Sequence, residues 1–192
     1  MRKAYLAILG LGSLLLSLNT YAAEPDSALA IFAGGCFWCT EADFDKLPGV
    51  LETTSGYIGG SIENPTYEEV SSGRSGHVEA VQVRYDPQQI SYAKLLEAFW
   101  PTIDPVNGNG QFCDTGPQYR SEIFYLDAEQ QRLAEASKAA LMASGRLAQP
   151  IATQIVAATT FYPAEDYHQN YHIKNPLRYS YYRHGCGRDQ RL

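Results

Sequence analysis

Residues 31–40 read IFAGGCFWCT, and this stretch decides how the beginning of the domain is organised. The apolar run at residues 29–33 has the composition of a buried strand, and two glycines end it. Residues 36–47 follow with apolar positions at helical spacing, and a Pro-Gly pair ends them. The sequence therefore predicts a strand, a glycine turn and a helix, with Cys36 at the N-terminus of the helix.

Cys36 is placed to be a nucleophile. A helix N-terminus presents free N–H groups and a partial positive charge, so we expect the pKa of this thiol to be lowered. The two glycines before it would let the backbone approach a ligand closely. A buried structural cysteine is the alternative. Together with Cys39 it also has the C-x-x-C spacing of thioredoxin-like proteins, so a thiol–disulfide oxidoreductase is a second hypothesis.

The rest of the chain predicts one domain of mixed strands and helices with two long loops. Ser91 and Asp127 stand where they can cap helices. Long loops in a compact domain are usually functional. The expected strands are 50–57, 77–87, 121–126 and 151–159, the expected helices 92–100, 127–142 and 164–171, and the long loops 56–76 and 101–120.

The N-terminal 22 residues have the layout of a cleaved export signal. A basic start precedes an apolar run that is too short to span a bilayer, and small residues end it. A membrane anchor is the alternative. We expect residues 23–192 to form a single exported domain, in a bacterial periplasm, without stable membrane association. The formal charge is −6, and loss of Arg2 and Lys3 would make it −8, which is unsuited to nucleic acid.

Four cysteines remain after residue 22, and in an exported protein they are usually structural disulfides. A disulfide-stapled binding protein without activity is therefore a third hypothesis, although a domain of this size can bury enough apolar surface without staples. A structural zinc site prefers two C-x-x-C pairs, and only one is present. His168 and His172 are four residues apart, but we expect packing rather than metal binding from them. The cysteines are Cys36, Cys39, Cys113 and Cys186.

Glu79 is the candidate acid. Residues 77–87 alternate, so Glu79 shares one face with Val81, Val83 and Tyr85. Burial on such a face raises the pKa of a carboxyl, which can then keep its proton and act as an acid. A solvated glutamate at a strand end is the alternative.

A thiolate beside a protonated carboxyl suits attack on a sulfoxide sulfur. That attack pushes negative charge onto an oxygen, which a proton donor and hydroxyl groups would stabilise. Phe37 and Trp38 could form the wall of a pocket for an S-methyl group. Acyl transfer by a Cys–His pair is the alternative. It would need one of His77, His168, His172 or His184, and the sequence singles out none of them.

Five blocks resemble, in order, those of the A-type peptide methionine sulfoxide reductases: GCFWCTE, GYIGGSIENPTYEEV, GHVEAVQVRYDP, CDTGPQYRSEIFY and FYPAEDYHQNY. The resemblance covers residues 29–172. It implies an α+β fold: a two-layer α/β sandwich, related to the ferredoxin-like plait, with long functional loops and an extended C-terminal tail. It also implies reduction of the S epimer of methionine sulfoxide, free or in oxidised proteins. We expect a monomer without bound cofactor or metal, whose electron donor is a thioredoxin-like protein.

The resemblance assigns roles to individual residues. Cys36 would attack the sulfoxide and become a sulfenic acid, and Glu79 would protonate the oxygen. The remaining expected site residues bind the oxygen or the methyl group: Tyr67, Asp114 and Tyr119 for the oxygen, Phe37 and Trp38 for the methyl group.

The cysteine that resolves the sulfenic acid is less determined. Many members of the family have glycine at the position of Cys39 and asparagine at that of Cys113. We expect Cys186 to resolve, because its glycine-flanked segment HGCGR could swing in, as tail cysteines do in the family. Cys39, one helical turn from the nucleophile, and Cys113, beside Asp114, are the alternatives.

Overall fold

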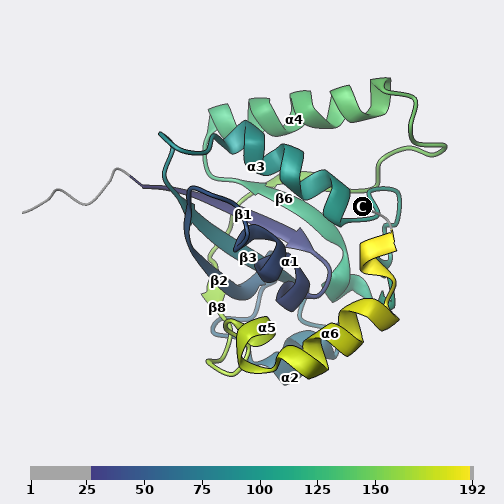
Figure 1. The fold of residues 1–192 in the computed structure, drawn as a ribbon. Helices are drawn as coiled ribbons and strands as arrows, with labels where there is room; N and C mark the ends of the chain where they lie inside the picture. Colours follow the sequence, from purple (N-terminus) through teal and green to yellow (C-terminus); the bar gives the residue numbers. More distant parts are fainter. Residues whose placement is uncertain (1–26, 191–192) are drawn as a thin grey trace, which may run out of the picture.

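A mixed six-stranded sheet forms the centre of the computed structural model, which describes residues 27–190 (Figure 1). The strand order is β7-β6-β1-β3-β2-β8, and neighbours are antiparallel except β6 and β7, which are parallel. Two further strands form a separate hairpin. The strands are β1 (Ala28–Gly34), β2 (Val50–Ile58), β3 (Val78–Tyr85), β4 (Gly110–Gln111), β5 (Asp114–Thr115), β6 (Ser121–Tyr125), β7 (Gln154–Ala157) and β8 (Tyr162–Pro163).

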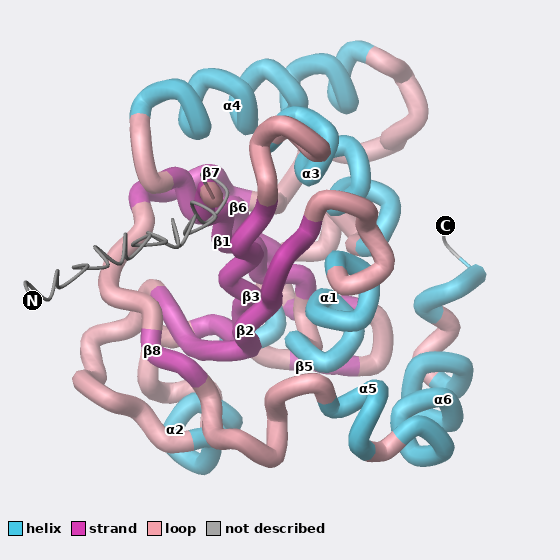
Figure 2. Tube along the Cα trace, turned by 60° about the vertical axis from the view of Figure 1, so that its left-hand side comes forward, coloured by secondary structure: helices cyan, strands magenta, loops and turns pink. Residues whose placement is uncertain are grey.

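The helices gather in two groups. Figures 1 and 2 show α3 and α4 together at one end of the sheet, and α2, α5 and α6 at the opposite end. The α-helices are α1 (Phe37–Phe44), α2 (Tyr67–Ser71), α3 (Tyr92–Phe99), α4 (Ala128–Ala143), α5 (Tyr171–Lys174) and α6 (Pro176–Gly185). The 3₁₀ helices are η1 (Trp100–Thr102), η2 (Pro117–Tyr119) and η3 (Arg188–Gln190).

The ferredoxin-like connectivity lies in the middle of the sheet. Along the chain the elements β1, α1, β2, β3, α3 and β6 follow one another, and their strands take the order β6-β1-β3-β2. That arrangement is two interlocked split βαβ units, which is the ferredoxin-like motif. The predicted α+β class is confirmed.

The sheet has one helix-covered face and one loop-covered face. Phe32 and Val81 belong to the core that α1, α3 and α4 cover. Ile31 belongs to the other core, against which Val156 of β7 and Phe161, between β7 and β8, pack. Because side chains alternate along a strand, Glu79 shares the helix-covered face with Val81, as the sequence predicts.

Helix caps agree with the predictions at two positions. The side chain of Ser91 accepts a hydrogen bond from the Lys94 N–H, and that of Asp127 accepts one from the Gln130 N–H. The segment 56–76, which was expected to be a loop, contains the short helix α2. Thr66 begins α2 with a complete capping box, in which its partner is Glu69. The T-x-x-E pattern was available in the sequence.

The tail differs from the prediction. The expected helix at 164–171 is wrong, because turns occupy 166–170 and α5 begins at Tyr171. Asn170 takes a left-handed φ of 53°, which interrupts helical continuation. A longer helix, α6, then starts with Pro176 in its first turn, where proline is favoured. The tail is therefore helical.

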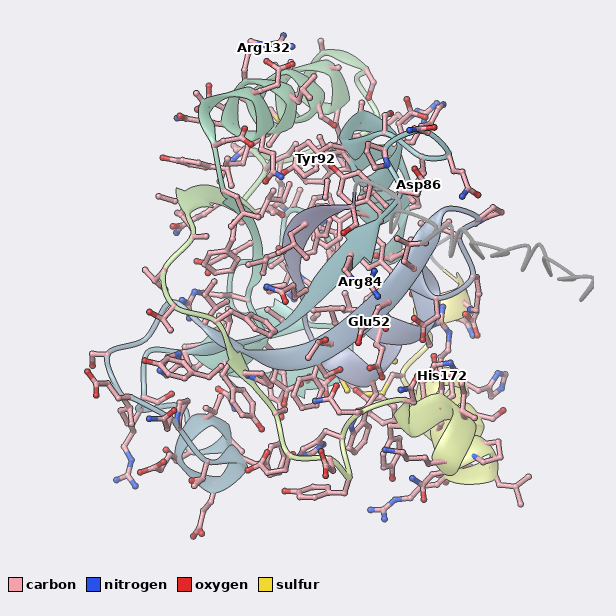
Figure 3. All side chains as sticks on the ribbon, turned by 90° about the vertical axis from the view of Figure 1, so that its left-hand side faces the viewer. Glu52, Arg84, Asp86, Tyr92, Arg132 and His172 are labelled. Atoms are coloured by element: carbon pink, nitrogen blue, oxygen red, sulfur yellow. A yellow bond between two sulfur atoms is a disulfide. The ribbon has the colours of Figure 1, made fainter. Side chains whose placement is uncertain are left out.

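An exposed ion pair joins β2 and β3. Arg84 Nε donates to Glu52 Oε2 over 3.0 Å, and the two residues are register partners (Figure 3). Exposed pairs of this kind contribute about 0–1 kcal/mol to stability.

The expected export signal lies outside the described residues and stays a prediction. Within residues 27–190, no helix has the length and apolar character needed to cross a bilayer.

Candidate active site

All seven side chains expected to act on the sulfoxide line one cavity of about 170 Å³. Ligand pockets for whole small molecules have volumes of about 300–1,000 Å³. The cavity therefore suits the end of one side chain. Its lining residues are Cys36, Phe37, Trp38, Tyr67, Glu79, Asp114, Tyr119 and Tyr182, the last of which the sequence analysis did not select.

Cys36 is the N-cap residue of α1, directly after β1. The glycines before it serve packing, and the expectation that they admit a ligand stays a prediction. A Cβ on Gly34 would lie 2.7 Å from Oγ1 of Thr40. A Cβ on Gly35, whose φ is +81°, would lie 2.5 Å from Cβ of Gln111. The glycine pair thus lets the chain's own side chains close around the base of the cavity.

Glu79 is buried next to the nucleophile. It is 2% exposed, and its Oε2 accepts a hydrogen bond from the Phe37 backbone N–H over 3.0 Å. Burial raises the pKa of this carboxyl to about 8, and the hydrogen bond from Phe37 only partly offsets that rise. The carboxyl therefore holds its proton at neutral pH, as expected for an acid.

The two cysteines of the C-x-x-C pair differ in the pKa of their thiols. Cys36 is 7% exposed and Cys39 is fully buried. Burial, and then the hydrogen bond to Cys39, raise the pKa of Cys36 well above its usual value, so the expected lowering is wrong. Burial outweighs the favourable helix N-terminus. The same hydrogen bond, followed by the charges of Arg188 and Arg183, lowers the pKa of Cys39 to about 7.

Two phenols face the same cavity. Tyr67 begins α2, and its backbone N–H donates to Oε1 of Glu165 over 2.8 Å. Burial and the neighbouring Glu79 raise the pKa of Tyr67 to about 12, although a hydrogen bond with Tyr119 opposes this. Burial also raises the pKa of Tyr119. Both hydroxyl groups therefore keep their protons and can donate hydrogen bonds to an oxygen.

Tail residues hold the aromatic wall. The Trp38 ring stacks on Tyr171 with centroids 3.7 Å apart, and its Nε1 donates to Nδ1 of His168 over 3.0 Å. Burial lowers the pKa of His168, so the neutral ring supplies this acceptor. The Phe37 ring lies 4.9 Å from the same imidazole. His168 therefore orients two aromatic side chains at once.

The other readings of the histidines lack support in the geometry. No histidine is among the residues that line the cavity, so a Cys–His acyl transferase has no base there. Nε2 of His172 lies 3.6 Å from Oδ2 of Asp45. Across the part of the chain that the structure describes, no group of three or more His, Cys, Asp or Glu side chains is arranged to hold a metal ion.

A disulfide closes the tail onto the β4–β5 hairpin. Cys113 and Cys186 are bonded, with Cα atoms 5.1 Å apart, whereas Cys36 and Cys39 are free. In this state the sulfur of Cys186 is therefore not available to Cys36, and its resolving role stays a prediction. The free sulfur next to Cys36 is that of Cys39.

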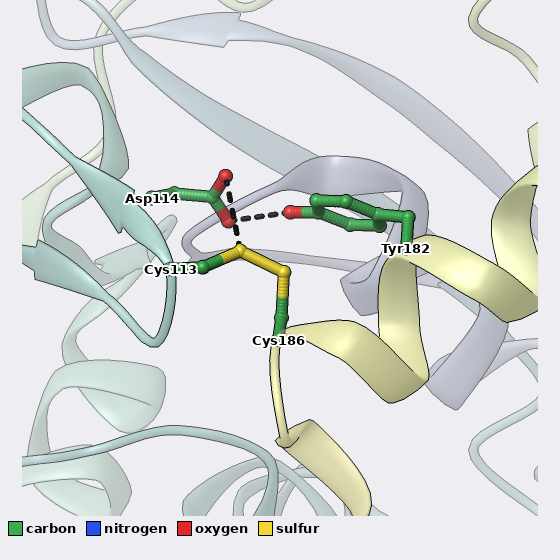
Figure 4. Close-up of a disulfide and its surroundings, with 4 residues drawn as sticks. All are labelled: Cys113, Asp114, Tyr182 and Cys186. Atoms are coloured by element: carbon green, nitrogen blue, oxygen red, sulfur yellow. Dashed lines mark hydrogen bonds between the residues drawn. A yellow bond between two sulfur atoms is a disulfide. The ribbon is translucent and has the colours of Figure 1, made fainter.

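The disulfide also explains why Tyr182 reaches the cavity. Its hydroxyl donates to Oδ2 of Asp114 over 2.5 Å, one residue from Cys113 (Figure 4). Tyr182 stands one helical turn before Cys186 on α6. Only the pairing of Cys186 with Cys113 could have pointed to it from the sequence.

Comparison with known proteins identifies the family. A protein-family model described as peptide methionine sulfoxide reductase matches residues 28–192. The chain belongs to this family. It is 56% identical over 161 residues to peptide methionine sulfoxide reductase MsrA of Bacillus licheniformis, a match that covers 84% of this chain and 89% of that protein.

Solved reductases have the same fold. Mxr1 from Saccharomyces cerevisiae in its reduced form superposes with a TM-score of 0.74 at 30% identity, covering 81% of this chain and 91% of Mxr1. Mxr1 in complex with Trx2 matches with a TM-score of 0.55 at 23% identity, covering 79% and 91%, which concerns the fold alone. This peptide methionine sulfoxide reductase is accordingly an oxidoreductase that acts on methionine sulfoxide.

The cavity and the free cysteines agree with the family in deciding among the three hypotheses. The reductase is favoured over a thiol–disulfide oxidoreductase, because the cavity contains a buried acid and two phenols that disulfide exchange does not need. A binding protein with two permanent disulfides is contradicted, since Cys36 and Cys39 are free.

Proposed function

We propose that this reductase acts on the S epimer of methionine sulfoxide, free or in proteins, through Cys36 as nucleophile and Glu79 as acid. The observation that carries the proposal is the single cavity in which the Cys36 sulfur meets a protonated carboxyl and two phenols. An enzyme that attacks a sulfoxide must protonate the leaving oxygen and bind it as charge develops. Phe37 and Trp38 would contact the methyl group.

The chemical step can be written with its protons. The Cys36 thiol passes its proton to the Cys39 thiolate as its sulfur attacks the sulfoxide sulfur. Glu79 gives its proton to the oxygen, which Tyr67 and Tyr119 also bind. The transient bond between the two sulfurs and the S–O bond of the sulfoxide then break while the oxygen bonds to the Cys36 sulfur. Two electrons pass from Cys36 to the sulfoxide sulfur, which becomes a thioether, and Cys36 becomes a sulfenic acid.

Resolution would follow from the neighbouring sulfur. The Cys39 thiol attacks the Cys36 sulfenic acid, an S–S bond forms, and the oxygen leaves as water with the thiol proton. We favour Cys39 over the sequence-based choice of Cys186, because Cys186 is bonded to Cys113 in this structure. Cys186 would resolve only in a form in which that disulfide is open.

The electron donor would be a thioredoxin-like dithiol. Cys36 and Cys39 are buried, whereas Cys113 is exposed and Cys186 is half-buried, so a protein dithiol can reach and reduce the second pair directly. The thiols of that pair would then exchange with the Cys36–Cys39 disulfide, which returns Cys36 and Cys39 to thiols and re-forms the Cys113–Cys186 bond. The existence of a complex between the related yeast Mxr1 and Trx2 supports this class of donor. Export to a periplasm, by a signal at residues 1–22, belongs to the same proposal, as does a monomeric state.

One-turnover chemistry tests the proposal. The protein, with Cys36 and Cys39 reduced, is mixed with the separated S and R epimers of N-acetylmethionine sulfoxide, and released methionine and new disulfides are measured by mass spectrometry. We expect methionine from the S epimer only, a Cys36–Cys39 crosslink, and no reaction in Cys36→Ser. Reduction by Cys36→Ser would refute the nucleophile, and a Cys36–Cys186 crosslink would restore the tail assignment.

A further inference from the structure

A buried arginine next to the two free cysteines has no part in the reaction described so far. Arg188 lies two residues beyond Cys186 and is 2% exposed. Its Nη2 donates to the Gly34 carbonyl, in the turn that leads to Cys36. Its guanidinium also lies over the ring of Phe112, 4.7 Å from the centroid. The tail thus buries one positive charge against the turn that precedes Cys36.

This charge lacks a carboxylate partner. Within residues 27–190, Arg188 forms no ion pair with a carboxylate, and its Nε and Nη1 donate to no oxygen or nitrogen atom. The other buried tail arginine differs, because Arg183 lies 2.9 Å from Oδ1 of Asp43 and 2.7 Å from Oδ1 of Asp189. Burying a charge is costly unless it is paired. A guanidinium with unused donors therefore calls for an anion at this place.

The sulfur of Cys39 meets that requirement. Cys39 is fully buried in the first turn of α1, directly after the Gly34–Cys36 turn that Arg188 contacts, and a side-chain hydrogen bond joins Arg188 to its sulfur. The charge of Arg188 also lowers the pKa of Cys39 more than that of Arg183 does. We propose that Arg188 is the counter-ion of a Cys39 thiolate and holds it ready to take the Cys36 proton and then resolve the sulfenic acid. Arg188 is thus a positioning residue for the reaction, and the inference rests on the proposed function.

The other ionisable groups around the pair leave this role to Arg188. Glu79 is protonated up to about pH 8, so it adds little negative charge at neutral pH. Arg183 is already paired with two carboxylates. The titratable and charged groups that face Cys39 and Arg188 come from the start of α1, β3, β5 and α6: Cys36, Glu79, Asp114, Tyr179, Tyr182 and Arg183.

The disulfide keeps Arg188 in place. Cys186 is tied to Cys113 on the same hairpin turn that carries Phe112, so the bond and the cation–π contact anchor one short segment. The thiolate on α1 and the disulfide on the tail are thereby physically connected through Arg188.

Titration of Cys39 alone tests the inference. In Cys36→Ser, with the Cys113–Cys186 disulfide intact, Cys39 is the one free thiol of the chain, and its thiolate is followed by ultraviolet absorbance against pH. Removing an opposite charge at this range is expected to raise the midpoint by about 1–2 pH units in Cys36→Ser/Arg188→Gln. Arg188→Lys, which retains the charge, should restore at least half of that shift.

Two further variants secure the interpretation. Arg188→Met places an unbranched apolar side chain in the buried site and should give the same rise if Arg188→Gln does not fold. Arg178→Gln removes an exposed arginine of the same tail and should leave the midpoint unchanged. A midpoint that stays the same in both folded Arg188 variants, or that moves equally in Arg178→Gln, overturns the proposal.

Kinetics then separate this role from the reaction itself. In otherwise native protein, Arg188→Gln should form the Cys36–Cys39 disulfide about tenfold more slowly at neutral pH, because less thiolate is present. The slowing should diminish as pH rises above the new midpoint, a dependence that a merely structural defect would not produce. If wild-type protein releases no methionine, the proposed function fails, while the Cys39 titration still decides whether Arg188 is its counter-ion.

Discussion

The Phe37 backbone N–H and Oε2 of Glu79 form a hydrogen bond of 3.0 Å between α1 and β3. The first N–H groups of a helix lack partners within the helix, and the side chain of Cys36, the N-cap residue, supplies none. Glu79 therefore caps α1 from a neighbouring strand. Because Phe37 directly follows Cys36, the same bond keeps the acid beside the nucleophile. This one hydrogen bond therefore caps α1 and also holds the acid in place.

Glu79→Gln should lower kcat/KM for methionine sulfoxide by about 10²–10⁴-fold, the usual range for loss of a general acid. Glutamine keeps an acceptor for the Phe37 N–H, so the fold should persist. Since the acid works only while protonated, wild-type activity should decline as pH rises through about 8, and the variant should lack that limb. The matched control is Glu52→Gln, at an exposed position of β2, which should retain wild-type kinetics. Full activity in Glu79→Gln would remove the acid from the mechanism.

Tyr182→Phe should lower kcat/KM about tenfold, because it removes the hydrogen bond to the half-buried Asp114 and leaves that carboxylate short of a donor. The adjacent Tyr181 is 85% exposed and provides the control, since Tyr181→Phe should behave as wild type. Steady-state assays on both variants check this. Equal kinetics for the two variants would show that the Tyr182 hydroxyl does not matter.

Glu41→Gln should stabilise the protein at alkaline pH and have little effect at acid pH. Glu41 is fully buried, and burial raises its pKa to about 7, although hydrogen bonds with the Asn170 backbone and the Ser55 side chain oppose that rise. A raised folded-state pKa gives stability below the unfolded value of about 4.5, which is lost as pH rises through the folded value. Urea unfolding at several pH values measures the difference. A constant difference across that range would contradict the prediction.

Cys113→Ser/Cys186→Ser should lower the free energy of unfolding. The disulfide closes a loop with a sequence separation of 73, for which the chain-entropy model predicts about 4 kcal/mol. Denaturant unfolding of the double variant, with the wild type under reducing conditions as a reference, gives the value. Unchanged unfolding midpoints would mean that the hairpin and tail stay docked without the bond.

Much of the fold was predictable because local rules and burial agree there. The alternation that puts Glu79 with Val81 on one face follows from strand geometry, and the caps at Ser91 and Asp127 follow from unsatisfied N–H groups. The tail helix α6 was missed because two of its large apolar side chains, Leu177 and Tyr181, are exposed, so the segment shows no core periodicity.

The sequence by itself determined the chemistry that this protein offers: its cysteines, the acid on an apolar strand face and the ordered blocks that match one family. Each of these features depends only on residue type and on spacing over a short stretch of the chain. Only the tertiary structure decided which of the two thiols has the lower pKa, because the pKa of Cys39 depends on Cys36 and on an arginine 149 positions away in the chain. Electrostatic effects depend on distance in space and on exclusion of water, and neither is written in local sequence.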